Sequence, residues 1–350
     1  MVAITVTRIT VKCWGQRSMK VSRATIAKKA GVTPTTVTCV LNGTRPVSEK
    51  VRARVMAAIE DLNYVPDIAA RAMQGKGSKQ IAIVVDNLKN PFFAELVDAI
   101  EAAGIEKGFF FSICGRVDMR KYTAHIIARK IDAVYFCSEI KESEADYVRQ
   151  LLDNNIKVLT SPRFPYFQEE ISRIDMATGQ AIAEAVDYLY GRGHRDIAFL
   201  TSFPRESNQD DRLRCFEKRM LERGLSPRSV CPEEVLVSTV DCGKLLFDRL
   251  LASGEPPTAV VGINDLVTIG AMRRAQERGM SVPEQISFVG IDGIELDTLV
   301  TPTLTTFRSN AADLGRKAFR MLLDLIETGQ TGTYNHKLTL QEGQSVRTIE

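Results

Sequence analysis

The chain has 350 residues, of which 44% are hydrophobic and 25% are charged, the composition of a water-soluble protein with room for two or three domains. No apolar run approaches the ~20 residues of a membrane span, and the N-terminus makes a poor signal peptide. The seven scattered cysteines contain no C-x-x-C pair, which argues against a disulfide framework or a zinc site. Residues 1–79 carry 14 Lys and Arg against 4 Asp and Glu, whereas the remainder carries 32 against 39. A basic head on a mildly acidic body favours a nucleic-acid-binding module joined to a different domain, and a solvated basic surface without a partner is the alternative.

Three short helices are predicted between residues 22 and 63. Each follows a residue that favours a helix start, and Gly31 suits the end of the first, because glycine adopts the left-handed conformation at helix ends. A helix, a tight Ala-Gly-Val turn and a second capped helix are the sequence form of the helix-turn-helix. The predicted helices are Ala24–Ala30 with Ser22 as N-cap, Pro34 to about Leu41 with Thr33 as N-cap, and a third from Ser48 to about Leu62.

A short Ala-rich segment, DIAARAMQGKGSK, follows Tyr64 and Pro66. Alanine, arginine and methionine favour a helix, but about eight residues are too few for a stable isolated helix in water. We therefore expect a linker that is flexible unless a partner orders it.

From Gln80 onward, apolar runs of strand length alternate with amphipathic helical stretches. Repeated strand-helix-strand units predict parallel, doubly wound sheets, and about 270 residues are many for one sheet, so two linked halves with a cleft are expected. Ligands of such sheets bind beyond the carboxyl ends of the strands. The predicted strands are residues 80–85, 109–114, 133–137, 157–161, 197–201, 259–263 and 286–291, and the predicted helices are 92–107, 179–192, 210–223, 242–253 and 266–279.

Several segments together resemble the LacI/GalR family of bacterial transcription regulators. Residues 25–73 resemble the DNA-binding head of that family, and NPFF at 90–93, GRGHRDIAFL at 191–200, Asn264-Asp265, VPEQISFVGID at 282–292 and TPTLTTF at 301–307 follow in order. The resemblance implies an N-terminal all-α helix-turn-helix headpiece plus hinge helix. An α/β core of two doubly wound parallel-sheet subdomains would follow, like the periplasmic binding proteins of type I.

The domain boundaries follow from the same resemblance. The expected parts are a non-native or disordered extension at 1–18, a helix-turn-helix domain at 19–66, a hinge helix and linker at 67–78, and a ligand-binding and dimerisation core at 79–350, whose first subdomain is about 79–161 and 308–334 and whose second is about 162–306 and 335–350. Two departures stand out. The stretch from Gly108 to Asp132 is about four residues shorter than usual, which predicts a trimmed edge, and Pro162 stands where the family often has an aspartate.

The resemblance also implies which residues contact DNA. Without an Arg, Asn or Gln among the base-reading positions, readout would depend on threonine hydroxyls, thymine methyls and DNA shape. Met73 would be an apolar wedge in the minor groove, or would pack against its partner hinge. Thr33 and Asn42 would contact phosphates or only cap the helix. The expected contacts are Pro34, Thr35 and Cys39 to bases, Thr33, Thr36, Thr38 and Asn42 to phosphates, and Ala70, Arg71 and Met73 to the minor groove.

The expected effector site collects residues that follow strands. Aromatic rings stack on an apolar ligand face, and the Arg fork suits vicinal hydroxyls or a carboxylate. Phe93 has the core as its alternative role, Asp292 the capping of the next segment, and His194 is expected to be a structural turn residue. The expected effector residues are Phe92, Phe93, Asn208, Arg212, Ser238, Asn264 and Asp292.

Two other classes of protein compete with this interpretation. A nucleotide-dependent enzyme would need a G-x-G-x-x-G or P-loop motif after a strand, or a nucleophile with its base, and the sequence has neither. A periplasmic sugar-binding protein would lack the basic head. We therefore expect a cytoplasmic, homodimeric repressor of a carbohydrate-utilisation operon that binds double-stranded, pseudo-palindromic operator DNA and a sugar-like effector, without enzymatic activity, metal or cofactor. A sugar acid or purine effector, or an activator, remains open.

Overall fold

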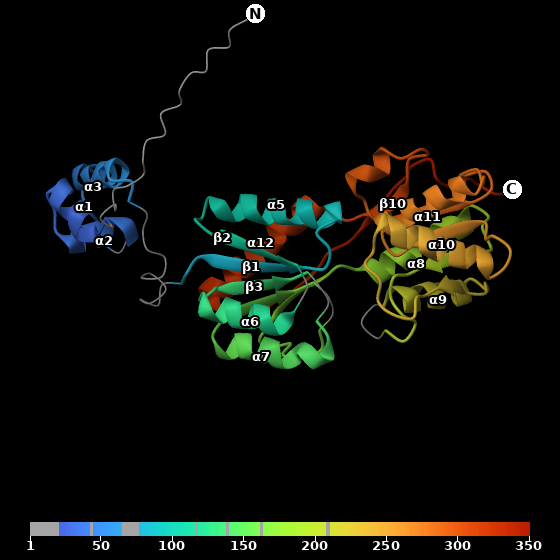
Figure 1. Cartoon of the computed structure of the whole chain (residues 1–350), viewed down its shortest axis with the longest axis horizontal. Helices are drawn as coiled ribbons and strands as arrows, with labels where there is room; N and C mark the ends of the chain where they lie inside the picture. Colours follow the sequence, from blue (N-terminus) through green and yellow to red (C-terminus); the bar gives the residue numbers. More distant parts are fainter. Residues whose placement is uncertain are drawn as a thin grey trace, which may run out of the picture. The chain divides into compact units, whose positions relative to one another are not determined.

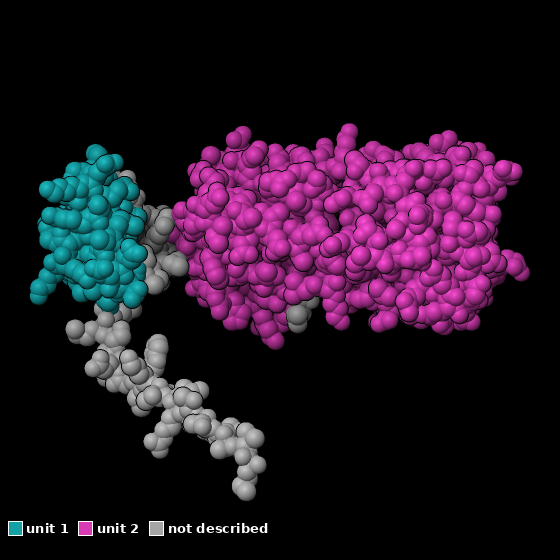
Figure 2. Space-filling model, turned by 90° about the horizontal axis from the view of Figure 1, so that it is seen from above, with its two compact units in different colours: residues 1–71 teal, residues 72–350 magenta. Residues whose placement is uncertain are grey.

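The computed structural model describes residues 21–42, 45–64, 77–115, 118–137, 140–161, 164–207 and 211–350. The chain forms two compact units, residues 1–71 and 72–350 (Figure 2). The expected extension at 1–18 and most of the expected hinge at 67–78 lie outside the described residues. The predicted fold class is confirmed for the rest, because the first unit is all-α and the second contains two mainly parallel sheets with helices around them (Figure 1).

The first unit has the three helices that the sequence predicts, α1 (Arg23–Ala30), α2 (Pro34–Asn42) and α3 (Glu49–Asp61). Seven apolar side chains form its core, and all come from these helices: Ile26, Ala27, Ala30, Val37, Val40, Val55 and Ala58. These side chains pack the three helices against one another.

The first sheet of the second unit has the strand order β11-β5-β4-β3-β1-β2, and its pairs are parallel. The order places β1 where the winding of the chain reverses. Ligands of open sheets bind beside such a reversal, at the carboxyl ends. Its strands are β1 (Gln80–Val85), β2 (Phe110–Gly115), β3 (Ala133–Phe136), β4 (Lys157–Thr160), β5 (Ser172–Asp175) and β11 (Thr333–Asn335).

Strand β1 is buried on both faces, as its continuous apolar run predicts. Ile81 and Ile83 pack with α5 and α12, whereas Ala82 and Val84 pack with α6 and α7. Both faces of the sheet are therefore covered. The helices are α5 (Pro91–Ile105), α6 (Met119–Ala128), α7 (Ala145–Asp153) and α12 (Ala311–Thr328), with a short 3-10 turn, η1 (Glu142–Glu144). The short stretch from Gly108 to Asp132 contains both β2 and α6, so this edge of the sheet has a strand and a covering helix.

The second sheet repeats this plan with the order β12-β10-β9-β8-β6-β7, and only the β10–β12 pair is antiparallel. Two helix pairs cover it, α8 with α9 and α10 with α11. Gly270 allows the second pair to approach closely, since a Cβ there would lie 2.0 Å from the carbonyl oxygen of Val240. The strands are β6 (Ile197–Leu200), β7 (Arg228–Val230), β8 (Ala259–Gly262), β9 (Ser287–Asp292), β10 (Thr305–Arg308) and β12 (Thr339–Gln341), and the helices are α8 (Thr178–Gly191), α9 (Arg212–Glu222), α10 (Val240–Ala252), α11 (Asp265–Glu277) and the 3-10 turn η2 (Glu295–Thr298).

The chain crosses between the two sheets three times. It leaves the first sheet after β5, returns between β10 and α12, and leaves again between β11 and β12. The predicted boundary of the first subdomain at about residue 161 is wrong, because β5 pairs with β4 and β11 and so extends the first half to Asp175. This strand, SRID, has no apolar run and gives no strand signal in the sequence.

Candidate DNA-binding surface and effector cleft

The turn between α1 and α2 is fixed by capping hydrogen bonds. The hydroxyl of Ser22 accepts from the Thr25 N–H at 3.2 Å at the start of α1, and Gly31 ends that helix at a φ of 62°. The hydroxyl of Thr33 then accepts from the Thr36 N–H at 3.2 Å, which begins α2. These bonds place the first residues of α2 as the motif requires.

One face of α2 is buried and its N-terminal end is open to solvent. Val37 and Val40 lie in the core, whereas Thr33, Pro34 and Thr35 are exposed. These exposed residues and the positive dipole end of this helix are therefore accessible to a phosphate or a base edge. Of the remaining expected contacts on α2, Thr36, Thr38 and Cys39 are half-buried.

The threonine hydroxyls of α2 differ in how they are engaged. Those of Thr33 and Thr36 lie 2.9 Å apart, and that of Thr38 donates to the Pro34 carbonyl oxygen at 3.0 Å. Within the described part of the chain, the hydroxyl of Thr35 has no hydrogen-bond partner. Thr35 is therefore the α2 hydroxyl that can bond to DNA without first breaking a bond within the protein. The side chain of Asn42, and all of Ala70, Arg71 and Met73, lie outside the described residues.

The loop after β1 supplies the first half's side of the cleft. Asn90 caps α5, since its Oδ1 accepts from the Phe92 N–H at 3.1 Å, and its Nδ2 donates at 3.1 Å to the carboxylate of Asp292 in the second half. The ring of Phe92 is buried in the core and meets Phe93 edge-on at a centroid distance of 5.3 Å. Phe93 lies at the margin of that core, so it has more surface to offer a ligand.

Asp292 ends β9 and is half-buried at the point where the two halves meet. Burial, reinforced by the nearby Asp265 carboxyl, raises the pKa of Asp292 to about 8, while Asn90 and Arg212 act in the opposite direction. Its backbone φ of 121° lies in a region that favours glycine. Arg212 begins α9 and donates to the Ile263 carbonyl oxygen at 3.2 Å, which holds the guanidinium beside the end of β8.

Two further expected residues lie near this edge of the second sheet. The Oδ1 of Asn264 accepts from the Val267 N–H at 3.0 Å and so caps α11. The hydroxyls of Ser238 and Ser202 lie 2.7 Å apart, and the Ser238 carbonyl oxygen accepts from Asn87 across the cleft at 3.1 Å. The expected residues thus lie after or at the end of successive strands of the second sheet: Arg212 after β6, Ser238 after β7, Asn264 after β8 and Asp292 at the end of β9. Asn208 lies outside the described residues.

A pair of buried carboxyl groups beneath Asp292 was not predicted. Asp265 is fully buried and accepts from the Thr306 hydroxyl at 2.7 Å and from the Gly293 N–H at 2.5 Å. Asp297 is 1% exposed, and neither of its oxygens has a hydrogen-bond donor within the described residues. Burial and mutual contact raise the pKa of Asp265 well above its usual range, and burial raises that of Asp297 to about 7. A proton on one of these two carboxyl groups would allow it to donate a hydrogen bond to the other.

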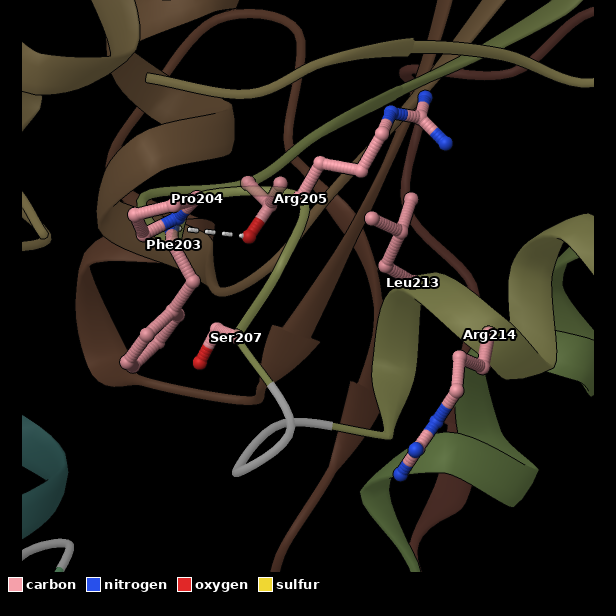
Figure 3. A pocket seen from close by; sticks show the side chains of 7 residues that line it. Phe203, Pro204, Arg205, Ser207, Leu213 and Arg214 are labelled. Carbon is pink, nitrogen blue, oxygen red and sulfur yellow. Dashed lines mark hydrogen bonds between the residues drawn. The ribbon is translucent and has the colours of Figure 1, made fainter. Parts of the chain in front are cut away.

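A small pocket lies beyond β6, beside the start of α9. Figure 3 shows Phe203 and Ser207 near each other there, with Leu213 on α9, and the guanidinium groups of Arg205 and Arg214 extending in opposite directions. Its volume of about 50 Å³ is far below the several hundred Å³ of a ligand site. It suits one or two water molecules rather than an effector.

A helix-turn-helix unit joined to a two-sheet unit with a polar cleft defines a class of DNA-binding regulator with a periplasmic-binding-protein-like sensor. The family model of the bacterial regulatory proteins of the lacI family matches residues 20–67, and the periplasmic binding protein-like domain matches residues 186–346. The HTH-type transcriptional repressor PurR of Proteus mirabilis (strain HI4320) is 32% identical over 324 residues, with 86% of this chain and 89% of the relative covered. The chain belongs to the lacI family.

A second relative supports this assignment, and a solved structure shares the fold. The HTH-type transcriptional regulator DegA of Bacillus subtilis (strain 168) is 30% identical over 311 residues, with 86% of this chain and 90% of that protein covered. The crystal structure of the Lac repressor dimer bound to operator and the anti-inducer ONPF has a TM-score of 0.79 at 24% identity and covers 94% of this chain and 100% of that one. Within the described residues, no helix is long and apolar enough to cross a membrane.

Proposed function

We propose that this regulator is a cytoplasmic homodimeric repressor whose two α2 helices enter successive major grooves of a pseudo-palindromic operator. The exposed N-terminal end of α2 supports this placement, because such helix ends present side chains and N–H groups to base edges and phosphates. Pro34, Thr35 and Cys39 would then contact bases. Thr33, Thr36, Thr38 and Asn42 would contact phosphates, and Ala70, Arg71 and Met73 the minor groove.

The second unit supports dimerisation through exposed apolar surface. Within the described residues, strand β2 is the last strand at one edge of the first sheet, and it exposes Phe110 and Ile113. On the second half, a groove of about 560 Å³ lies between α10, α11 and residues 299–301, and Leu299 at its border is 71% exposed. Apolar edges and patches of this kind are typical of interfaces, and a second copy of this chain is the partner that we propose for them.

The effector site that we propose is the polar cleft where Asn90 meets Asp292. Asp292, Arg212 and Asn264 combine a carboxyl, a cation and an amide at the carboxyl ends of neighbouring strands, which suits a ligand with several hydroxyl groups. A sugar is therefore our first candidate, and a sugar acid or a purine is the alternative. The single observation that supports the proposal is the hydrogen bond from Asn90 to Asp292, because it joins a polar side chain of each half at the junction of the two halves.

Fluorescence anisotropy with labelled inverted-repeat DNA from the gene's own upstream region tests DNA binding. We expect an affinity that falls steeply with salt, as phosphate contacts require, and a loss of discrimination between operator variants in Thr35→Ala. The control is Thr258→Ala, which lies in the sensor. Salt-insensitive binding, or unchanged discrimination in Thr35→Ala, would contradict the proposed role of α2.

A thermal-shift screen of sugars, sugar acids and purines then tests the cleft. A ligand that binds only the folded form raises the melting temperature, and Asp292→Asn should remove that increase. A reporter gene under the identified operator distinguishes a repressor from an activator by the sign of its response when the regulator is deleted.

A further inference from the structure

The three segments that cross between the halves are joined to one another by hydrogen bonds. The first segment begins at Asp175, the second contains Ser309, and the third contains His336. The His336 N–H donates to the Asp175 carbonyl oxygen at 2.7 Å, and the Ser309 hydroxyl lies 3.1 Å from Nε2 of His336. Ser309 and His336 are 3% and 4% exposed, so these bonds are shielded from water.

The same chain of bonds continues to the cleft. The Ser309 N–H donates to the Asp292 carbonyl oxygen at 2.8 Å, and Asp292 is the residue whose side chain bonds to Asn90 of the other half. Asp292 holds a φ of 121°, a conformation that persists only where neighbours enforce it. The Ser309 N–H is one such neighbour, and the side chain of the same residue lies within hydrogen-bond distance of His336.

We propose that His336 is a positioning residue of the cleft, which holds Asp292 through Ser309 and joins the three crossing segments. These three segments form the hinge between the two halves of the second unit, and protonation of His336 loosens this hinge. The inference deepens the proposed function, because it assigns a regulatory element to the cleft described there.

Protonation acts through the second ring nitrogen. In the neutral tautomer that carries its proton on Nε2, Nε2 donates to the Ser309 hydroxyl, and Nδ1 is a buried acceptor without a hydrogen-bond partner in the described part of the chain. A bare acceptor there is tolerable, but protonation would add a charge and an N–H donor without an acceptor, which is costly in a buried site. Burial accordingly lowers the pKa of His336, and the Asp313 carboxylate opposes that shift.

The other charged groups around the hinge do not remove this cost. Asp313 lies on α12, the Tyr334 ring packs at a centroid distance of 6.1 Å from His336, and Lys317 lies 5.0 Å over that ring. Asp292 meets Ser309 through its carbonyl group, not its carboxylate. An opened hinge, in which water reaches the imidazole, therefore binds a proton more readily than the closed one.

Hydrogen–deuterium exchange of the full chain, at about pH 5.5 and about pH 7.5 and corrected for the intrinsic exchange rate, measures this opening directly. Peptides over residues 305–312 and 333–340 contain the N–H groups of Ser309 and His336. We expect several-fold faster exchange of these peptides at the lower pH, while peptides over β8 stay protected and report global stability. The measurement needs neither DNA nor effector, so its failure is separate from a failure of the proposed function.

Three variants separate a positioning role from a packing role. His336→Gln keeps a side-chain amide in place of Nε2 but does not titrate, so its hinge peptides should stay protected at both pH values. Ser309→Ala should exchange faster at both. His125→Gln, on the exposed surface of α6, should behave as the parent chain does. A His336→Gln chain that retains the full pH response, or a Ser309→Ala chain with parent-like hinge exchange, would overturn the proposal.

Discussion

Replacing Asp297 by Asn should make the protein more stable, and increasingly so as the pH rises. Asp297 is almost fully buried, and its pKa is raised from 3.8 to about 7, chiefly by burial. An acid with a higher pKa in the folded state binds its proton more tightly there than in the unfolded chain. Its favourable contribution is complete below about pH 4 and is lost as the pH rises to 7.

The size of the effect follows from the pH interval. Each pH unit between the two pKa values changes the free energy of unfolding by about 1.4 kcal/mol, so about 2–3 kcal/mol separates pH 5 from pH 7 and above. Asn cannot ionise, and its amide can donate to Asp265. The advantage of Asp297→Asn over the parent chain should therefore grow by about 2–3 kcal/mol, or about 4–6 °C in the melting temperature of the larger unit.

Differential scanning calorimetry of the full chain at about pH 5, 6, 7 and 8 follows this difference. Asp146→Asn on α7 removes an exposed carboxylate and serves as the control. If the melting temperatures of parent and Asp297→Asn changed in parallel across this range, the assignment of a buried, shared proton to Asp265 and Asp297 would be wrong.

Three further substitutions test other parts of the structure. Thr33→Ala removes the N-cap of α2 and should cost about 1 kcal/mol of headpiece stability by circular dichroism, whereas Thr33→Ser should restore it. Gly270→Ala places a methyl group against the Val240 carbonyl oxygen and should lower the stability of the larger unit by about 1–3 kcal/mol, as measured by urea titration. An unchanged midpoint would refute the close approach of α10 and α11. Asn90→Asp keeps the cap of α5 but replaces the amide donor to the Asp292 carboxyl with an acceptor. The melting temperature should therefore fall above about pH 8 and recover near pH 5. A pH-independent change would refute the bond between the halves.

The sequence predicted most strongly those elements that are buried on both faces. The apolar runs of β1, β3, β6 and β8 match strands whose neighbours cover them completely, so composition and structure agree. Strand β5 is different: Ser172 and Arg173 pair near the edge of a sheet, where position within the sheet rather than side-chain character decides the conformation. The boundary of the first subdomain was placed too early for that reason.

The candidate site was predictable where a residue lies at or after the end of a strand. It was not predictable where a role depends on a contact with a residue far away in the sequence. Two signals in the sequence indicated Arg212, Asn264 and Asp292: their positions at or after strand ends, and the family resemblance. Asn90 stood in the quoted NPFF motif, but its bond to a residue 202 positions away cannot be read from local sequence. Asp297 was not predicted because aspartate is rarely fully buried, so its residue type indicates a surface position.

The interleaving of the two halves has a consequence for synthesis on the ribosome. Helix α12 and strand β11 complete the first sheet, and strand β12 completes the second, so neither sheet has all its strands until translation is nearly finished. The three-helix head, by contrast, is complete within the first fifth of the nascent chain and can fold as soon as it emerges. A truncated chain would therefore contain a folded DNA-binding domain without a completely folded sensor domain.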